Sequence, residues 1–110
     1  MTYWETVHQE EREGYNINLE ITHEIESPDW DFETEQERKD LIEKINNGNI
    51  LWFVAKVTAM KHGILLADDY LWGCCYVSME DFIKDAYYQD MVDNVLTAAK
   101  QKIIDLSSNE

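Results

Sequence analysis

The side chains with the most reactive chemistry are two adjacent cysteines and three histidines, in a chain of 110 residues. A cysteine nucleophile needs a histidine base and an orienting carboxylate, and His62 with either cysteine and Asp68 or Asp69 supplies those residue types. The spacing of this set matches no local signature of a cysteine enzyme. Cys74 and Cys75 are adjacent and so lack the Cys-x-x-Cys spacing of zinc and redox sites. We therefore expect two small buried cysteines, no cofactor and no enzymatic activity.

Carboxylates are the second group that could do chemistry, because acidic residues stand at every second position from 29 to 37 and Asp40 follows. In this register they occupy positions 1, 3, 5, 7, 9 and 12 of a calcium-binding loop. However, Thr34 replaces the turn glycine of such a loop, Asp40 replaces its bidentate glutamate, and no entering helix is expected upstream. No metal site is therefore expected here. Asp68 and Asp69 are expected to end a strand or to lie in a turn.

The strongly negative net charge limits which classes of molecule can bind this chain directly. The formal net charge is −14, from 23 acidic and 9 basic residues, which disfavours direct contact with nucleic acid or anionic lipid. The first residues have neither a basic nor an apolar stretch of a signal peptide, and no apolar run has the length of a membrane span. We expect a cytoplasmic protein with a basic partner. With 45% hydrophobic residues, positions 1–110 should form a single domain.

Strict alternation of apolar and polar residues from Asn16 to Glu26 predicts a half-buried strand. The apolar face of this strand consists of Ile17, Leu19, Ile21, His23 and Ile25. On that face His23 is expected to be a hydrogen-bonded core histidine. Residues 3–14 fit either a partner strand or a short helix, and the sequence does not choose between them.

Further along the chain, Thr34 and Glu37 form a capping box that predicts a helix over residues 35–47. Branched and aromatic residues over 50–60 and 64–72 predict two strands joined by a tight turn. A second capping signature at Ser78 and Asp81 begins a helical region that ends near residue 106, as two helices or as one kinked helix. The predicted class is α+β, a small antiparallel sheet of three to four strands packed by a short helix and a C-terminal helical region.

Two of the acidic residues have a structural explanation, because Glu35 and Glu37 would lie in the first turn of a capped helix, where the helix dipole favours negative charge. The other carboxylates have no lysine or arginine between them in the sequence. These are Glu20, Glu24, Glu26, Asp29, Asp31 and Glu33. Alternate residues of a strand are about 6.8 Å apart, which is comparable to the phosphate spacing of a nucleic-acid strand.

This row of carboxylates therefore predicts a surface that imitates nucleic acid and docks on a lysine- and arginine-lined groove. Trp30 and Phe32 could add apolar anchoring beside it. A solvated acidic face without a partner is the alternative. The large apolar content also leaves room for a homodimer.

The small size, the six carboxylates above and the lack of a catalytic motif resemble the acidic anti-defence proteins of phages and mobile elements. That class includes DNA-mimic antirestriction proteins and anti-CRISPR inhibitors. The resemblance implies a stoichiometric inhibitor that binds a basic nucleic-acid-binding protein in the cytoplasm of the host cell. The alternative function is an accessory protein-interaction domain whose acidity serves only solubility.

Overall fold

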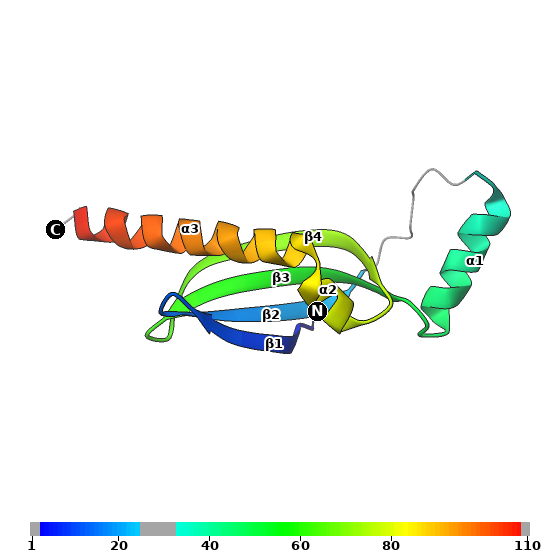
Figure 1. Cartoon of the computed structure of the whole chain (residues 1–110), viewed down its shortest axis with the longest axis horizontal. Coiled ribbons are helices and arrows are strands. Elements are labelled where there is room, and N and C mark those ends of the chain that lie inside the picture. Colours follow the sequence, from blue (N-terminus) through cyan, green and yellow to red (C-terminus); the bar gives the residue numbers. More distant parts are fainter. Residues whose placement is uncertain (1–2, 25–32, 109–110) are drawn as a thin grey trace.

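The computed structural model describes residues 3–24 and 33–108, which form a four-stranded antiparallel sheet and three helices (Figure 1). The strands lie side by side in chain order: β1 (Glu5–Arg12), β2 (Tyr15–His23), β3 (Leu51–Lys61) and β4 (Ile64–Tyr76). The helices are α1 (Glu35–Asn46), α2 (Met79–Lys84) and α3 (Ala86–Ser108). The predicted α+β class is confirmed, and β1 and β4 are the two edge strands.

Two-residue turns connect both hairpins of the sheet. Glu13 and Gly14 join β1 to β2, and His62 and Gly63 join β3 to β4. All four residues have positive φ angles, between 54° and 84°. This conformation matches the right-handed twist of the flanking strands. The second hairpin agrees with the prediction, and the structure resolves the ambiguity over residues 3–14 in favour of a strand.

The core lies between one face of the sheet and α3, which runs across β3 and β4 (Figure 1). The largest fully buried side chains are Ile17, Leu19, Val57, Phe82, Tyr88, Val92 and Val95. Burial of each stabilises the fold by about 1.5–3 kcal/mol for side chains of this size. The members from α3 are three or four residues apart, so they share one helix face.

The alternation predicted for β2 is confirmed at Ile17 and Leu19, which are fully buried, but the prediction for His23 is wrong. His23 is exposed. It is the last residue of β2, whereas the helices pack mainly against β3 and β4. The core face of the sheet is therefore left uncovered at this corner.

Side-chain caps begin two of the helices, as predicted. The Thr34 hydroxyl accepts a hydrogen bond from the backbone N–H of Glu37 at 3.2 Å, and Ser78 does the same for Asp81 at 3.2 Å. Asp85 adopts an extended conformation, with ψ of 154°, and so separates α2 from α3. The C-terminal region is therefore two helices.

Helix α1 extends away from the end of the sheet opposite the C-terminus of α3 (Figure 1). The structure describes every residue of α1, and none of them is buried. The helix lies in the segment that connects β2 to β3. These two strands are direct neighbours in the sheet, and their pairing extends as far as His23 and Phe53. Among the helices of the described ranges, none has the length and apolar character that a membrane crossing requires.

The sheet core yields a stability prediction with a matched control. Replacing Leu19, which is fully buried, by alanine should lower the free energy of unfolding by about 2–5 kcal/mol, because it leaves a cavity in the buried core. The same change at Leu106, which is 58% exposed on α3, should alter it by less than about 0.5 kcal/mol. Urea denaturation measures both values. Equal losses in the two variants would contradict the assigned core.

Candidate functional site: the uncovered face of the sheet

Three of the seven residues predicted to bind a partner lie in the described part of the chain: Glu20, Glu24 and Glu33. Glu20 and Glu24 are on the face of β2 that points away from α3, and Glu33 is exposed just before α1. The other four lie outside the described residues: Glu26, Asp29, Trp30 and Asp31.

Glu20 has a basic partner, although no lysine or arginine lies near it in the sequence. Its carboxylate lies 3.4 Å from the ammonium of Lys56, which is directly opposite on β3. Glu24 is also held in place, because it accepts a hydrogen bond from the backbone N–H of Gly73 on β4 at 2.9 Å. Both partners are remote in sequence and come close only through strand pairing. These two carboxylates are therefore fixed on the sheet.

Aromatic side chains gather on the same face as these carboxylates. The rings of Tyr70 and Trp72 on β4 are stacked, with centroids 6.0 Å apart and an interplanar angle of 10°. Trp4 meets Tyr70 edge-on at 6.1 Å, and the Lys56 ammonium lies 5.1 Å from the centroid of the Trp4 ring. Trp72 is 67% exposed, so this aromatic group remains accessible to a partner.

A β-bulge in β4 lies directly beside Trp72. Phe53 pairs with Cys74, whereas Ala55 pairs with Leu71, so β4 has an extra residue opposite Val54. Gly73 adopts a φ of +66°, and a Cβ at this position would lie 3.4 Å from the Trp52 ring. Bulges of this kind re-aim side chains and are common beside functional sites. Here the extra residue shifts the alternation of side chains after Trp72. Trp72 lies on the uncovered face, and Cys74 therefore points into the core.

A hollow of about 740 Å³ lies where this face meets α1. Most of its wall is apolar, with Trp4, Trp52 and Trp72 contributed by the sheet region and Ile45 by α1. Glu24 also lines the hollow. A volume in this range with few polar groups in the wall is typical of binding sites. The hollow thus combines an apolar anchor site with the acidic end of β2.

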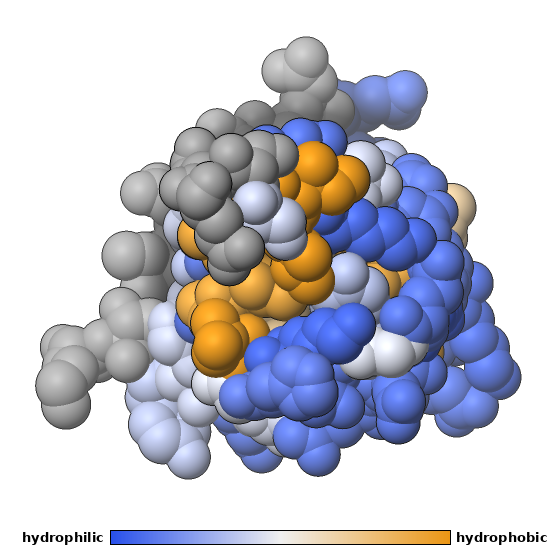
Figure 2. Space-filling view, turned by 90° about the vertical axis from the view of Figure 1, so that its left-hand side faces the viewer, coloured by the Kyte–Doolittle hydropathy of each residue, from blue (hydrophilic) through white to orange (hydrophobic). Residues whose placement is uncertain are grey.

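A second apolar surface lies at the other end of the molecule. Figure 2 views the molecule from the side where the two hairpins and the last turns of α3 lie, and it shows hydrophobic surface surrounded by hydrophilic residues. Ile64, Leu65 and Leu106 are among the exposed apolar side chains of these segments. This surface is separate from the hollow.

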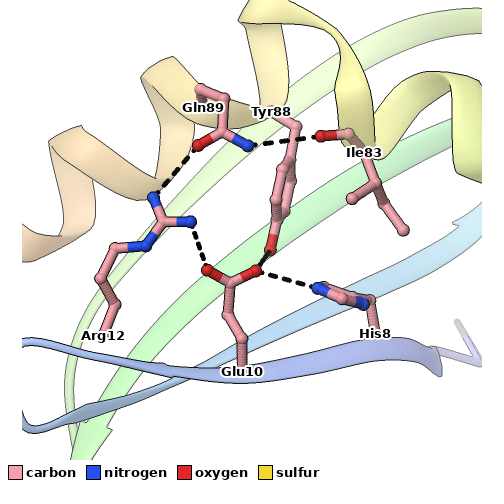
Figure 3. Close-up of polar contacts among 6 residues, drawn as sticks. All are labelled: His8, Glu10, Arg12, Ile83, Tyr88 and Gln89. Carbon is pink, nitrogen blue, oxygen red and sulfur yellow. Dashed lines mark hydrogen bonds and ion pairs between the residues drawn. The ribbon is translucent and has the colours of Figure 1, made fainter.

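A polar network connects edge strand β1 to α3 (Figure 3). The Glu10 carboxylate accepts hydrogen bonds from the His8 ring at 2.9 Å and from the Tyr88 hydroxyl at 3.1 Å, and it pairs with Arg12. Arg12 in turn donates to the Gln89 side chain at 3.1 Å. The three β1 residues alternate along the strand and so point to the same face. This alternation of charged residues is the sequence signal for the network, which the sequence analysis missed.

The network is a structural link, because its hydrogen bonds occupy the groups that would otherwise be reactive. Burial alone would raise the pKa of Glu10, but the hydrogen bonds from His8 and Tyr88 and the charge of Arg12 outweigh it and lower the pKa. Burial and the negative charge of Glu10 raise the pKa of Tyr88. Within the described residues, no buried side-chain nitrogen or oxygen lacks a hydrogen-bond partner.

The structure does not assemble the cysteine, histidine and aspartate set. His62 is in the turn before β4, and Cys74 and Cys75 are near the far end of that strand, on the order of 40 Å away along an extended chain. Burial raises the pKa of Cys74 to about 12, which makes the thiol a poor nucleophile. Cys74 is buried, as predicted, whereas Cys75 is only half-buried.

Asp68 and Asp69 lie in the middle of β4, so the prediction that they end a strand or form a turn is wrong. Their side chains point to opposite faces of the sheet and have different partners. Asp69 accepts a hydrogen bond from Asn94 of α3 at 3.2 Å, and Asp68 accepts one from the Tyr70 hydroxyl at 3.4 Å. In the described ranges, no group of three or more histidine, cysteine or acidic side chains could hold a metal ion.

The Glu10 network predicts a pH-dependent contribution to stability. Replacing Glu10 by glutamine keeps the size of the side chain and removes its charge, which should lower the free energy of unfolding by about 1–2 kcal/mol near neutral pH. Because the folded pKa is below the ordinary value of 4.5, the stabilisation is present above that value and is lost as the pH falls through the folded pKa. Urea denaturation measures the free energy of unfolding of both proteins between about pH 7 and pH 3. The difference between the variant and the wild type should shrink as the pH falls.

The matched control is Glu11→Gln, which removes the same charge from the next residue, an exposed one on the other face of the strand. It should have a smaller effect. A difference for Glu10→Gln that stays constant over the pH range, or that equals the effect of the control, would contradict the role assigned to the network.

Comparisons of the chain with protein-family models, with curated proteins and with solved structures find no match. The functional assignment therefore rests on the charge of this chain and on the geometry of the uncovered sheet face.

Proposed function

We propose that the protein is a small, non-enzymatic inhibitor that binds the basic nucleic-acid-binding surface of another protein and thereby blocks nucleic-acid binding. The observation that carries the proposal is the aromatic hollow on the uncovered sheet face, with the acidic end of β2 in its wall. An apolar centre beside charged groups is the usual anatomy of a protein-binding surface.

The charge supports a basic partner. A net charge of −14 attracts lysine- and arginine-rich surfaces and repels nucleic acid itself. The predicted binding residues Glu24, Glu26, Asp29, Asp31 and Glu33 follow one another closely in the sequence. Glu24 is held by Gly73 beside the hollow, so a fixed charge stands at the start of this acidic row. Because Glu20 is paired with Lys56, it contributes less negative charge to the proposed binding surface than the sequence suggested.

The resemblance to anti-defence proteins of phages suggests the class of target, a CRISPR or restriction nuclease in the cytoplasm of the host cell. Such an enzyme has a positively charged channel for nucleic acid. An acidic protein seated in that channel would exclude the substrate by occupying its site. No catalytic step is needed for this kind of inhibition.

A second candidate function is favoured by the exposed aromatic side chains, among them Tyr3 and Trp72. They suit an accessory domain that binds an ordinary partner through apolar contacts, with the acidity serving solubility. The two functions differ in salt dependence, because exposed charge attraction is screened over about 8–10 Å at physiological ionic strength.

The first experiment captures partners from a host lysate on the immobilised protein and elutes them with rising salt. We expect a basic nucleic-acid-binding protein that is released at moderate salt, and whose binding to nucleic acid is lost when the acidic protein is added. A captured partner that resists salt and keeps its nucleic-acid binding would favour the accessory domain and contradict the inhibitor.

Matched charge reversals then test the position of the binding surface. Changing Glu26, Asp29 and Asp31 to lysine should weaken inhibition by at least about tenfold, because three attractive charges become repulsive. The control changes Asp90, Asp93 and Asp105 on α3, all exposed, to lysine and alters the net charge by the same amount. Both variants should keep the melting temperature of the wild type. Equal inhibition by the two variants would show that only overall charge matters.

A further inference from the structure

We infer that the stacked pair of Tyr70 and Trp72 on β4 recognises arginine side chains of the partner and prefers them to lysine. This inference rests on the proposed function, because it names the side chain that a basic partner would place on the uncovered sheet face. It assigns a specificity that charge attraction alone does not supply.

The pair offers a rigid and accessible aromatic surface. Its rings are nearly parallel, and Tyr70 is supported from the side by the edge-on ring of Trp4. Trp72 and Tyr70 are 67% and 40% exposed, so both side chains are accessible to solvent. The bulge at Gly73 fixes the strand from which Trp72 projects. Little conformational freedom would be lost when a flat cation stacks on this surface.

The protein already places one cation on this aromatic group. The Lys56 ammonium lies over the Trp4 ring, with a centroid distance of 5.1 Å, and the Glu20 carboxylate is 3.4 Å from it. The same combination of an aromatic face and a nearby carboxylate occurs on β4, where the exposed Asp68 bonds to the Tyr70 hydroxyl. A carboxylate has about four acceptor positions, so Asp68 keeps capacity for a guanidinium donor.

Charge complementarity selects a cationic occupant over a neutral apolar one. The chain carries −14 overall, and Lys56, already paired, is the basic residue beside this group. Arginine fits better than lysine, because a planar, weakly hydrated guanidinium stacks on an aromatic face while its edge donates hydrogen bonds. The compact ammonium of lysine is strongly hydrated and loses more solvation on contact.

The experiment measures binding of fluorescent oligoarginine and oligolysine peptides of equal length by fluorescence anisotropy, at low and at physiological salt. For the wild-type protein we expect the arginine peptide to bind more tightly by roughly two- to fivefold for each stacked arginine. Trp72→Ala should remove this preference and leave the salt-sensitive binding that both peptides share. The control is Tyr87→Ala, which removes an aromatic side chain that is 59% exposed on α3 and should keep the preference.

The wild-type ratio of the two affinities is informative even if Trp72→Ala fails to fold. Equal, salt-sensitive binding of the two peptides overturns arginine recognition and leaves the proposed inhibition intact, because an acidic surface alone gives that result. A preference that survives in a folded Trp72→Ala variant also overturns it. Self-association of the wild type that Trp72→Ala abolishes would assign the surface to a second copy of this chain instead. If neither peptide binds, the inference fails, and the charge reversals above decide the proposed function separately.

Discussion

The apolar side chains on one face of the sheet are hidden from water because α3 lies across β3 and β4. Ile17, Leu19 and Val57 belong to the same buried cluster as Val92 and Val95, and all five are almost completely buried. One helix is wide enough to cover only part of a four-stranded sheet. The β1 edge is therefore attached to α3 by the polar network around Glu10, and the corner at the end of β2 remains exposed.

In the described ranges, no helix packs across the second face of the sheet. Antiparallel sheets commonly have one solvated face, and polar residues usually occupy it. Here Trp4, Tyr70 and Trp72 lie on that face together with charged residues. Aromatic side chains are enriched at binding surfaces, which connects the one-sided covering of the sheet to the function proposed.

Negative charge also protects the sheet from unwanted pairing. Strand β4 is an edge strand of 13 residues, and a long open edge is a template for another strand. Asp68 and Asp69 lie in its middle, so two copies paired antiparallel along β4 would bring carboxylates close together. This repulsion disfavours edge-to-edge association and leaves the flat face as the surface for a partner.

The sequence by itself determined the features that depend on neighbouring residues: the alternation of Ile17 and Leu19, the caps at Thr34 and Ser78, the second hairpin and the α+β class. It also supplied the charge on which the proposed partner depends. Only the tertiary structure decided that residues 5–12 form a strand, that Glu20 pairs with Lys56, and that His23 lies outside the core. It also brought Trp4, Trp52 and Trp72 to one surface, which the sequence did not indicate. The physical reason is that caps and turns are set by interactions within a few residues, whereas these contacts depend on strand register, on the bulge at Gly73 and on where α3 lies.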